Sequence, residues 1–281
     1  MKKTVICSLS LIFLLSQGIA QTNTIDKKWR FGLRVTPQSV WLLSSDKNNV
    51  SAGRNLSSGF GLNVEYRFSN VAAILWGVGG DFEGGDYTFK NDPAGNYVVK
   101  YLRDADEFVT PDNVSSTRVE YTLKSRTVKT THVSLPLILK LNTAEYNGFK
   151  YFGMFGLEAG IRVKATADDS YSEIRKVDPV TKNLAPVEQA LEEKDINIAD
   201  ETALIPVRLG LNAGIGTEYR LGGTTSLLLS INFFRSFTNL MSKTSDYAYY
   251  RTEISNGTAT YSYIRQNLKQ SALRLTIGIM F

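Results

Sequence analysis

The sequence predicts an all-β protein of antiparallel strands, and three observations carry this prediction. The last eleven residues alternate between apolar side chains and small or polar ones, which is the period-two pattern of a strand with two unlike faces. Seven earlier segments repeat this alternation. The connections between the segments are alternately short and long, so all the short ones would lie at one end of the sheet.

The first three strands lie before residue 84. The first begins near Trp29, with apolar residues at odd positions and Arg or Gly at even ones. Pro37 has no N–H to donate, so we expect a bulge or an end of regular pairing there. The second strand covers about 57–68, and a tight turn at 69–70 follows it. The third strand places three apolar side chains outward: Ile74, Trp76 and Val78.

The next four strands show the same pattern over longer runs. The fourth ends with 132–141, whose odd positions are all apolar, and a short connection leads to the fifth, 150–164. The sixth covers 207–220, with Arg, Gly, Asn and Glu at its even positions. A tight turn at 221–224 then leads to the seventh strand, 226–233.

The eighth strand, 271–281, indicates the environment of the whole sheet. Its apolar face ends on the aromatic Phe281, and the opposite face carries Arg274 and Gly278. A strand between lipid and the polar lumen of a barrel needs these two faces. We expect Phe281 to act as the C-terminal signal that the barrel assembly machinery recognises.

The lengths of the connections predict an orientation. The long ones cover about 45–56, 84–118, 168–203 and 242–268, and they are polar. Short turns on one side and long loops on the other are typical of an outer-membrane barrel with both termini in the periplasm. The predicted fold is therefore an eight-stranded antiparallel up-and-down transmembrane β-barrel with long extracellular loops.

Aromatic residues provide a separate indication. In the predicted topology, several lie near the periplasmic ends of their strands: Phe31, Tyr66, Phe68, Tyr151, Tyr219 and Phe281. Aromatic rings are enriched at the level of the lipid headgroups, so this cluster predicts one interface of the membrane. A thinner outer belt is expected from Trp41, Phe60 and Phe82.

The N-terminus agrees with an envelope location. Residues 1–20 combine Lys2 and Lys3 with an apolar run and a small-residue ending, as in a cleaved signal peptide, so the mature protein would cover 21–281. Cleavage would remove Cys7, the only cysteine, and lower the formal charge from +5 to +3, which does not indicate a nucleic-acid partner. No later stretch of about twenty apolar residues predicts a spanning helix.

Three segments resemble a known family. Val133–Leu141 (VSLPLILKL), Leu211–Leu221 (LNAGIGTEYRL) and Leu273–Phe281 are similar to the outer-membrane β-barrel proteins common in Bacteroidetes, often called porin-family or PorT-family proteins. The resemblance implies an eight-stranded membrane barrel. It implies no shared catalytic residues and no conductance.

The inward positions of the strands predict a charge network in the lumen. Asp81 and Lys140 belong to this set, and its other members follow: Arg30, Arg34, Glu65, Arg67, Glu158, Arg162, Lys164, Arg208, Glu218, Arg220 and Arg274. Eight strands enclose a lumen that side chains can fill, and charges held away from water need partners. We expect ion pairs that plug the barrel. The alternative is a narrow porin whose excess of cations conducts small anions.

The sequence predicts no catalytic residues, no cofactor and no metal site. His132, the only histidine, is expected inside the barrel, and nothing marks a nucleophile elbow beside it. The function expected is structural, or a surface role in which the long loops contact a protein or glycan. A lipid-modifying enzyme and a subunit of a secretion or assembly machine remain alternatives. Outer-membrane lipid is the expected surrounding partner.

Overall fold

The computed structural model describes most of the chain from Lys27 onward, with gaps. The described ranges are 27–44, 49–51, 53–91, 98–105, 107–110, 117–177, 184–187, 191–198, 205–240, 249–255, 258–263 and 267–281. The predicted signal peptide lies outside these residues. No described residue belongs to a helix that is long and apolar enough to cross a membrane.

Fifteen strands make up one antiparallel sheet. They are β1 (Trp29–Ser44), β2 (Asn49–Ser51), β3 (Asn55–Arg67), β4 (Ala72–Phe89), β5 (Lys100–Asp104), β6 (Glu107–Val109), β7 (Val119–Asn142), β8 (Phe149–Val177), β9 (Leu184–Pro186), β10 (Glu192–Asn197), β11 (Val207–Gly222), β12 (Thr225–Ser236), β13 (Tyr249–Ser255), β14 (Thr258–Tyr263) and β15 (Leu268–Met280).

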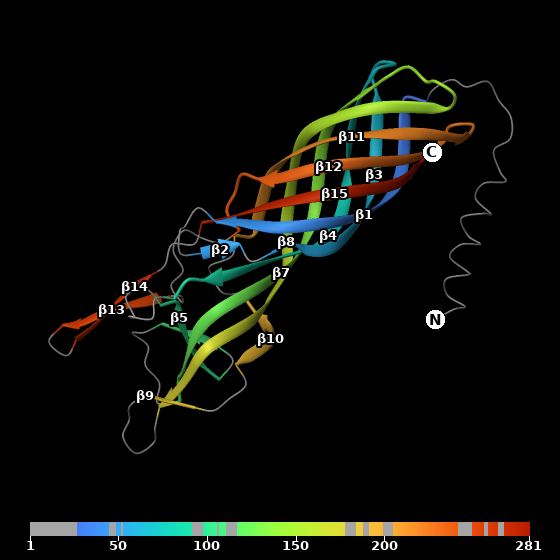
Figure 1. Ribbon diagram of the computed structural model, residues 1–281. Helices are drawn as coiled ribbons and strands as arrows, with labels where there is room; N and C mark the ends of the chain where they lie inside the picture. Colours follow the sequence, from blue (N-terminus) through green and yellow to red (C-terminus); the bar gives the residue numbers. More distant parts are fainter. Residues whose placement is uncertain are drawn as a thin grey trace, which may run out of the picture.

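Eight of these strands close into a barrel (Figure 1). The order around the ring is β1, β3, β4, β7, β8, β11, β12 and β15, and β15 pairs again with β1. The C-terminal residue completes the closure, because Phe31 and Phe281 exchange two backbone hydrogen bonds of 2.9 and 2.8 Å. The predicted eight-stranded antiparallel barrel is therefore confirmed.

The outer surface of the ring is apolar. Side chains such as Leu157 (55 % exposed), Leu137 (59 %) and Val163 (60 %) stand outward, although large apolar residues are usually buried in a soluble protein. The predicted aromatics lie on this surface near one end of the strands, where Trp29 contacts Tyr66 with ring centroids 4.7 Å apart. This end carries the tight turns and the C-terminus, and we call it the turn end (Figure 1).

The inner surface is more mixed than the alternation predicts. Many inward residues are polar or charged, but six apolar ones pack against one another inside the ring: Leu75, Ile138, Phe152, Met154, Leu228 and Met280. The lumen therefore contains an apolar part in addition to the expected charges. An eight-stranded lumen is narrow enough for side chains to fill it, and apolar ones fill part of it here.

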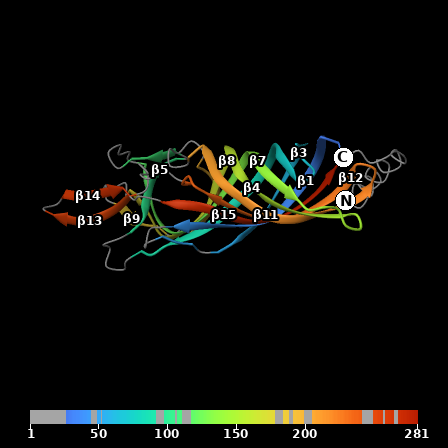
Figure 2. The ribbon, with the colours of Figure 1, turned by 90° about the horizontal axis from the view of Figure 1, so that it is seen from above.

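The opposite end of the barrel continues into an ordered extension (Figures 1 and 2). β7 and β8 remain paired up to Val119 and Lys176, and β5, β9 and β10 add to them. The β13–β14 hairpin joins β5 through one pair, Tyr249 and Lys100. We call the parts of β4, β7 and β8 beyond the ring, together with β5, β6, β9, β10, β13 and β14, the extension.

The extension changes the predicted loops. Strands occupy parts of 84–118, 168–203 and 242–268, which the sequence presented only as polar connections. A buried cluster that includes Tyr101, Leu123 and Ile174 holds these strands together. Apolar residues are sparse along this region, so their alternation gives no lipid-facing pattern to read.

Two local departures from the expected strands have physical causes. β1 continues through Pro37, and its ladder with β15 omits Thr36 and Pro37 before it resumes in the same register. In β8, Thr131 lies opposite Lys164 and His132 opposite Arg162, so Val163 is an extra residue in a β-bulge. The bulge inverts the alternation from Lys164 onward.

Candidate functional site

The lumen holds a first group of ion pairs near the turn end, which we call the inner network. Lys140, from β7, is fully buried, and its Nζ lies 2.7 Å from Glu65 Oε2 and also contacts Glu218. Arg30 reaches the same two carboxylates, at 3.2 and 2.8 Å, and Arg67 Nε lies 2.7 Å from Glu65. β1, β3, β7 and β11 each supply part of this network, so it ties the circumference of the barrel together.

A second group, the central network, lies further along the lumen. Glu158 accepts hydrogen bonds from Arg208 (2.9 Å) and Arg274 (2.7 Å). Glu83 contacts both of these guanidinium groups, and Asp81 lies 3.7 Å from Arg208. His132 Nδ1 is 3.2 Å from Glu83 Oε2. Side chains from five strands, β4, β7, β8, β11 and β15, therefore meet in one network across the interior.

The central network packs against one aromatic ring, and two glycines leave space for the ring and for Arg208. The ring of Phe234 is fully buried, and the guanidinium groups of Arg208 and Arg274 each lie 4.5 Å from its centroid. Cations over an aromatic face are attracted by its quadrupole. A Cβ at Gly210 would lie 2.5 Å from this ring, and one at Gly160 would lie 3.1 Å from Arg208 Nε. Side chains thus occupy the space that a pore would need.

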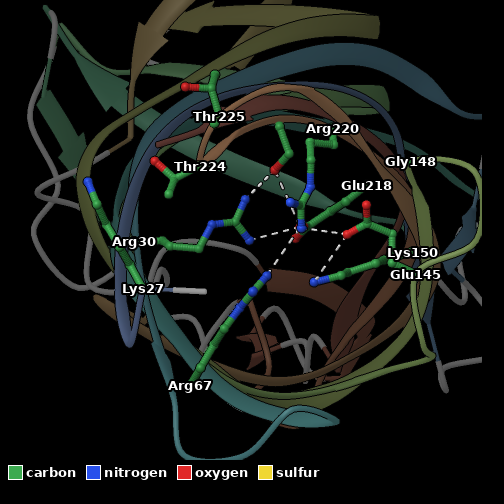
Figure 3. Close-up of a pocket in the computed structure, with 12 residues that line it drawn as sticks. Lys27, Arg30, Arg67, Glu145, Gly148, Lys150, Glu218, Arg220, Thr224 and Thr225 are labelled. Carbon is green, nitrogen blue, oxygen red and sulfur yellow. Dashed lines mark hydrogen bonds and ion pairs between the residues drawn. The ribbon is translucent and has the colours of Figure 1, made fainter. Parts of the chain in front are cut away.

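The two networks differ in their balance of charge. The central network sets two guanidinium groups, those of Arg208 and Arg274, against three carboxylates, those of Asp81, Glu83 and Glu158. Near the turn end, cations outnumber carboxylates, because Lys27, Lys150 and Arg220 gather there with the inner network (Figure 3). The excess of cations in the sequence is therefore concentrated at one mouth and does not line the lumen evenly.

The structure places most of the predicted lumenal residues inside the ring. Twelve of the thirteen charged positions lie in the interior or at its mouth, including Arg220, which pairs with Glu145 at 2.5 Å. The placement expected for Lys164 is wrong, because the bulge turns its side chain to the outer surface. Arg162 precedes the bulge and keeps its partly buried position.

Three contributors were missed in the sequence. Glu83 has the same parity as Asp81, and that parity could have identified it. Phe234 follows the outward Phe233, so its parity also predicts an inward ring. Gln38, which accepts a 2.9 Å hydrogen bond from Arg274 Nε, lies just after Pro37, where regular pairing was expected to stop.

The described residues offer no clear chemistry for catalysis. His132 is 1 % exposed and faces Glu83, and its surroundings are the paired charges of the central network. Within the described part of the chain, no group of three or more His, Cys, Asp or Glu residues is arranged to hold a metal ion. The arrangement acts mechanically, since it fixes the strands relative to one another.

A third polar group stabilises the extension. Arg126 donates two hydrogen bonds of 2.6 Å to Asp169, and the Tyr101 hydroxyl donates another of 2.8 Å. Burial raises the pKa of Tyr87 to about 12, and burial followed by the charge of Asp169 raises the pKa of Tyr101 and of Tyr171. These hydroxyls therefore stay protonated at neutral pH, and those of Tyr101 and Tyr171 donate hydrogen bonds to Asp169 and Glu193.

Comparisons with known proteins define the class. Residues 19–242 match the family described as "Outer membrane protein beta-barrel domain". The match covers more than half of the chain, and the chain belongs to this family of outer-membrane barrels. A search among curated proteins found no match.

Solved structures with related shapes include three outer-membrane proteins. OprG from Pseudomonas aeruginosa has 10 % identity and a TM-score of 0.40, covering 91 % of this chain and 97 % of its own. A major outer membrane protein from Thermus thermophilus has 12 % identity and a TM-score of 0.38, covering 91 % and 99 %. Neisserial surface protein A has 8 % identity and a TM-score of 0.36, covering 91 % and 98 %. The assignment to the family of outer-membrane barrels rests on the match over residues 19–242.

Proposed function

We propose that this protein is a non-enzymatic, closed outer-membrane barrel that presents its extension as a binding surface outside the cell. Both termini and the turn end would face the periplasm. Residues 1–20 would be removed as a signal peptide, and Phe281 would serve as the assembly signal. The partner would be a protein or glycan of the surroundings or of the envelope.

The filled lumen supports the closed state. Glu83 and Glu158 bridge Arg208 and Arg274, and Phe234 lies against both guanidinium groups. An ion crossing the barrel would have to separate these pairs, and breaking a buried pair costs about 3–5 kcal/mol. The central network therefore acts as a plug.

The extension supports a surface role. Strands of this length are not needed to cross a membrane, since about 9–11 residues suffice, whereas β8 has 29. The extra length is stabilised by a buried cluster and by the Arg126–Asp169 pair. A rigid platform of this kind lowers the entropy lost when a partner binds.

Single-channel recording tests the closed state. Refolded protein in planar bilayers should show no steady current in salt, because the central network blocks the lumen. A wide porin measured under the same conditions provides the positive control. Large steady currents would contradict the plug, and small anion-selective currents would favour the narrow-porin alternative.

A further inference from the structure

The turn end of the lumen opens into a small basic pocket (Figure 3). Five cationic side chains line it: Lys27, Arg30, Arg67, Lys150 and Arg220. Of the residues that the structure describes, two carboxylates belong to the lining, Glu145 and Glu218. The formal charge of the lining side chains is therefore +3.

Among the described residues, each carboxylate of the lining is shared between cations, and Arg30 and Arg67 also pair with Glu65 of the inner network. Arg30 lies 2.8 Å from Glu218, and Arg67 lies 3.5 Å from the same oxygen. Arg220 and Lys150 both approach Glu145 Oε2, at 2.5 and 3.6 Å. Each acid is thus shared between at least two cations of the lining, and Figure 3 shows the three guanidinium groups converging near Glu218.

A lumen that is only plugged does not require an excess of cations over carboxylates at its mouth. The central network fills the lumen without an excess of cations, since two guanidinium groups there face three carboxylates. At the mouth, like charges are instead held close together, which raises the energy of the empty pocket and favours any anion that enters. The charge pattern therefore indicates binding in addition to closure.

The size of the pocket limits the ligand. Its volume is about 20 Å³, room for one or two groups the size of water. A whole sugar ring would not fit in this volume, but the terminal oxygens of a phosphate would. The hydroxyls of Thr224 and Thr225, which also line the pocket, supply neutral donors beside the cations. An arginine guanidinium group can donate bidentate hydrogen bonds to two oxygens of one phosphate.

We propose that the basic pocket binds a phosphate group at the periplasmic mouth of the barrel. This inference depends on the orientation given under the proposed function. The phosphate belongs either to a lipid headgroup of the inner leaflet or to a soluble periplasmic molecule. The pocket holds the phosphate while the rest of the ligand remains outside.

Calorimetry with pyrophosphate tests the pocket on folded protein in a zwitterionic detergent. The double variant Lys150→Gln/Arg220→Gln should bind pyrophosphate at least about tenfold more weakly, because two charged donors are lost. Glu145→Gln should bind it more tightly, about two- to fivefold, because a competing carboxylate is removed. All three positions are partly exposed at the rim. The pair of opposite effects separates binding from loss of folding.

Lys164→Gln is the matched control, since it removes a cation from the outer surface at the far side of the barrel. Its affinity for pyrophosphate should equal that of the unchanged protein. Absence of pyrophosphate binding, or equal affinity in all variants, would overturn the proposal. This assay in detergent does not depend on orientation or conductance, so its failure would leave the closed barrel standing.

Nanodiscs distinguish the two sources of the phosphate. If the group comes from lipid, phosphatidylglycerol in the disc should weaken pyrophosphate binding to the unchanged protein but not to the double variant. If the group comes from a soluble molecule, binding should be the same in zwitterionic and anionic discs. Either result supports phosphate binding in the pocket, and the difference between them identifies the source of the phosphate.

Discussion

Replacing Lys140 with methionine is expected to lower the free energy of unfolding by about 3–5 kcal/mol. The ammonium is fully buried between Glu65 and Glu218, and its Nζ lies 4.5 Å from the ring of Phe152. Methionine keeps the stem but removes the charge, which leaves two buried carboxylates to share Arg30 and Arg67. Urea titration in detergent micelles, followed by tryptophan fluorescence, measures the loss.

Lys164→Met provides the comparison for this variant. The alternation of the sequence puts both lysines inside the lumen, but the bulge at Val163 puts Lys164 outside. Its replacement should change the free energy of unfolding by no more than about 0.5 kcal/mol. Equal losses in the two variants would mean that the placement of one of these lysines is wrong.

Replacing Leu157 with arginine is expected to cost about 2–4 kcal/mol. Leu157 is 55 % exposed in the middle of the ring and lies opposite Leu137 of β7 and Leu211 of β11. A charge at this level would face the centre of the hydrocarbon, where its hydration is lost. Unfolding from lipid vesicles and the heat-dependent gel mobility of the folded barrel would both report the change.

The same substitution at Thr166 serves as the control. Thr166 lies on the outer face of β8 beyond the bulge, beside Lys129 of β7, where charges already occur. Thr166→Arg should cost no more than about 1 kcal/mol, as expected near the edge of a membrane. A cost at Thr166 that matches the cost at Leu157 would contradict the position assigned to the lipid boundary.

The ring could be predicted from the sequence because lipid imposes one simple pattern. Along β15, every outward residue from Leu273 to Phe281 must be apolar, and polar side chains are left for the lumen. The length of the connections then orders the strands. These signals come from neighbours in the chain, so no alignment or structure is needed to read them.

The bulge in β8 could not be predicted in the same way. One extra residue, Val163, exchanges the lumenal and outer faces of the strand from that point on. The residue types around it are compatible with either face. Lys164 would suit a polar lumen as well as it suits the headgroup region. Only the pairing of Lys164 with Thr131 decides between the two.

Which charged residues pair with each other inside the lumen could also not be predicted from the sequence. Glu158 and Arg274 are 116 residues apart, and their contact depends on how far the ring shears as it closes. The extension was missed for another reason. Its strands pack around a buried cluster that includes Tyr101 and Tyr171, and this packing needs no long apolar stripe on the outer face.

Spin labels along β8 test the central claim most directly. Single cysteines at positions 155–168 are introduced into a chain that begins at Gln21 and so lacks Cys7. In lipid, oxygen should reach labels at odd positions up to 163, and even positions should be shielded. Beyond the bulge, even positions should become the outward ones and should meet water. An alternation that continues unchanged through 168, or labels at 155–163 that show no access to lipid, would contradict the barrel described above.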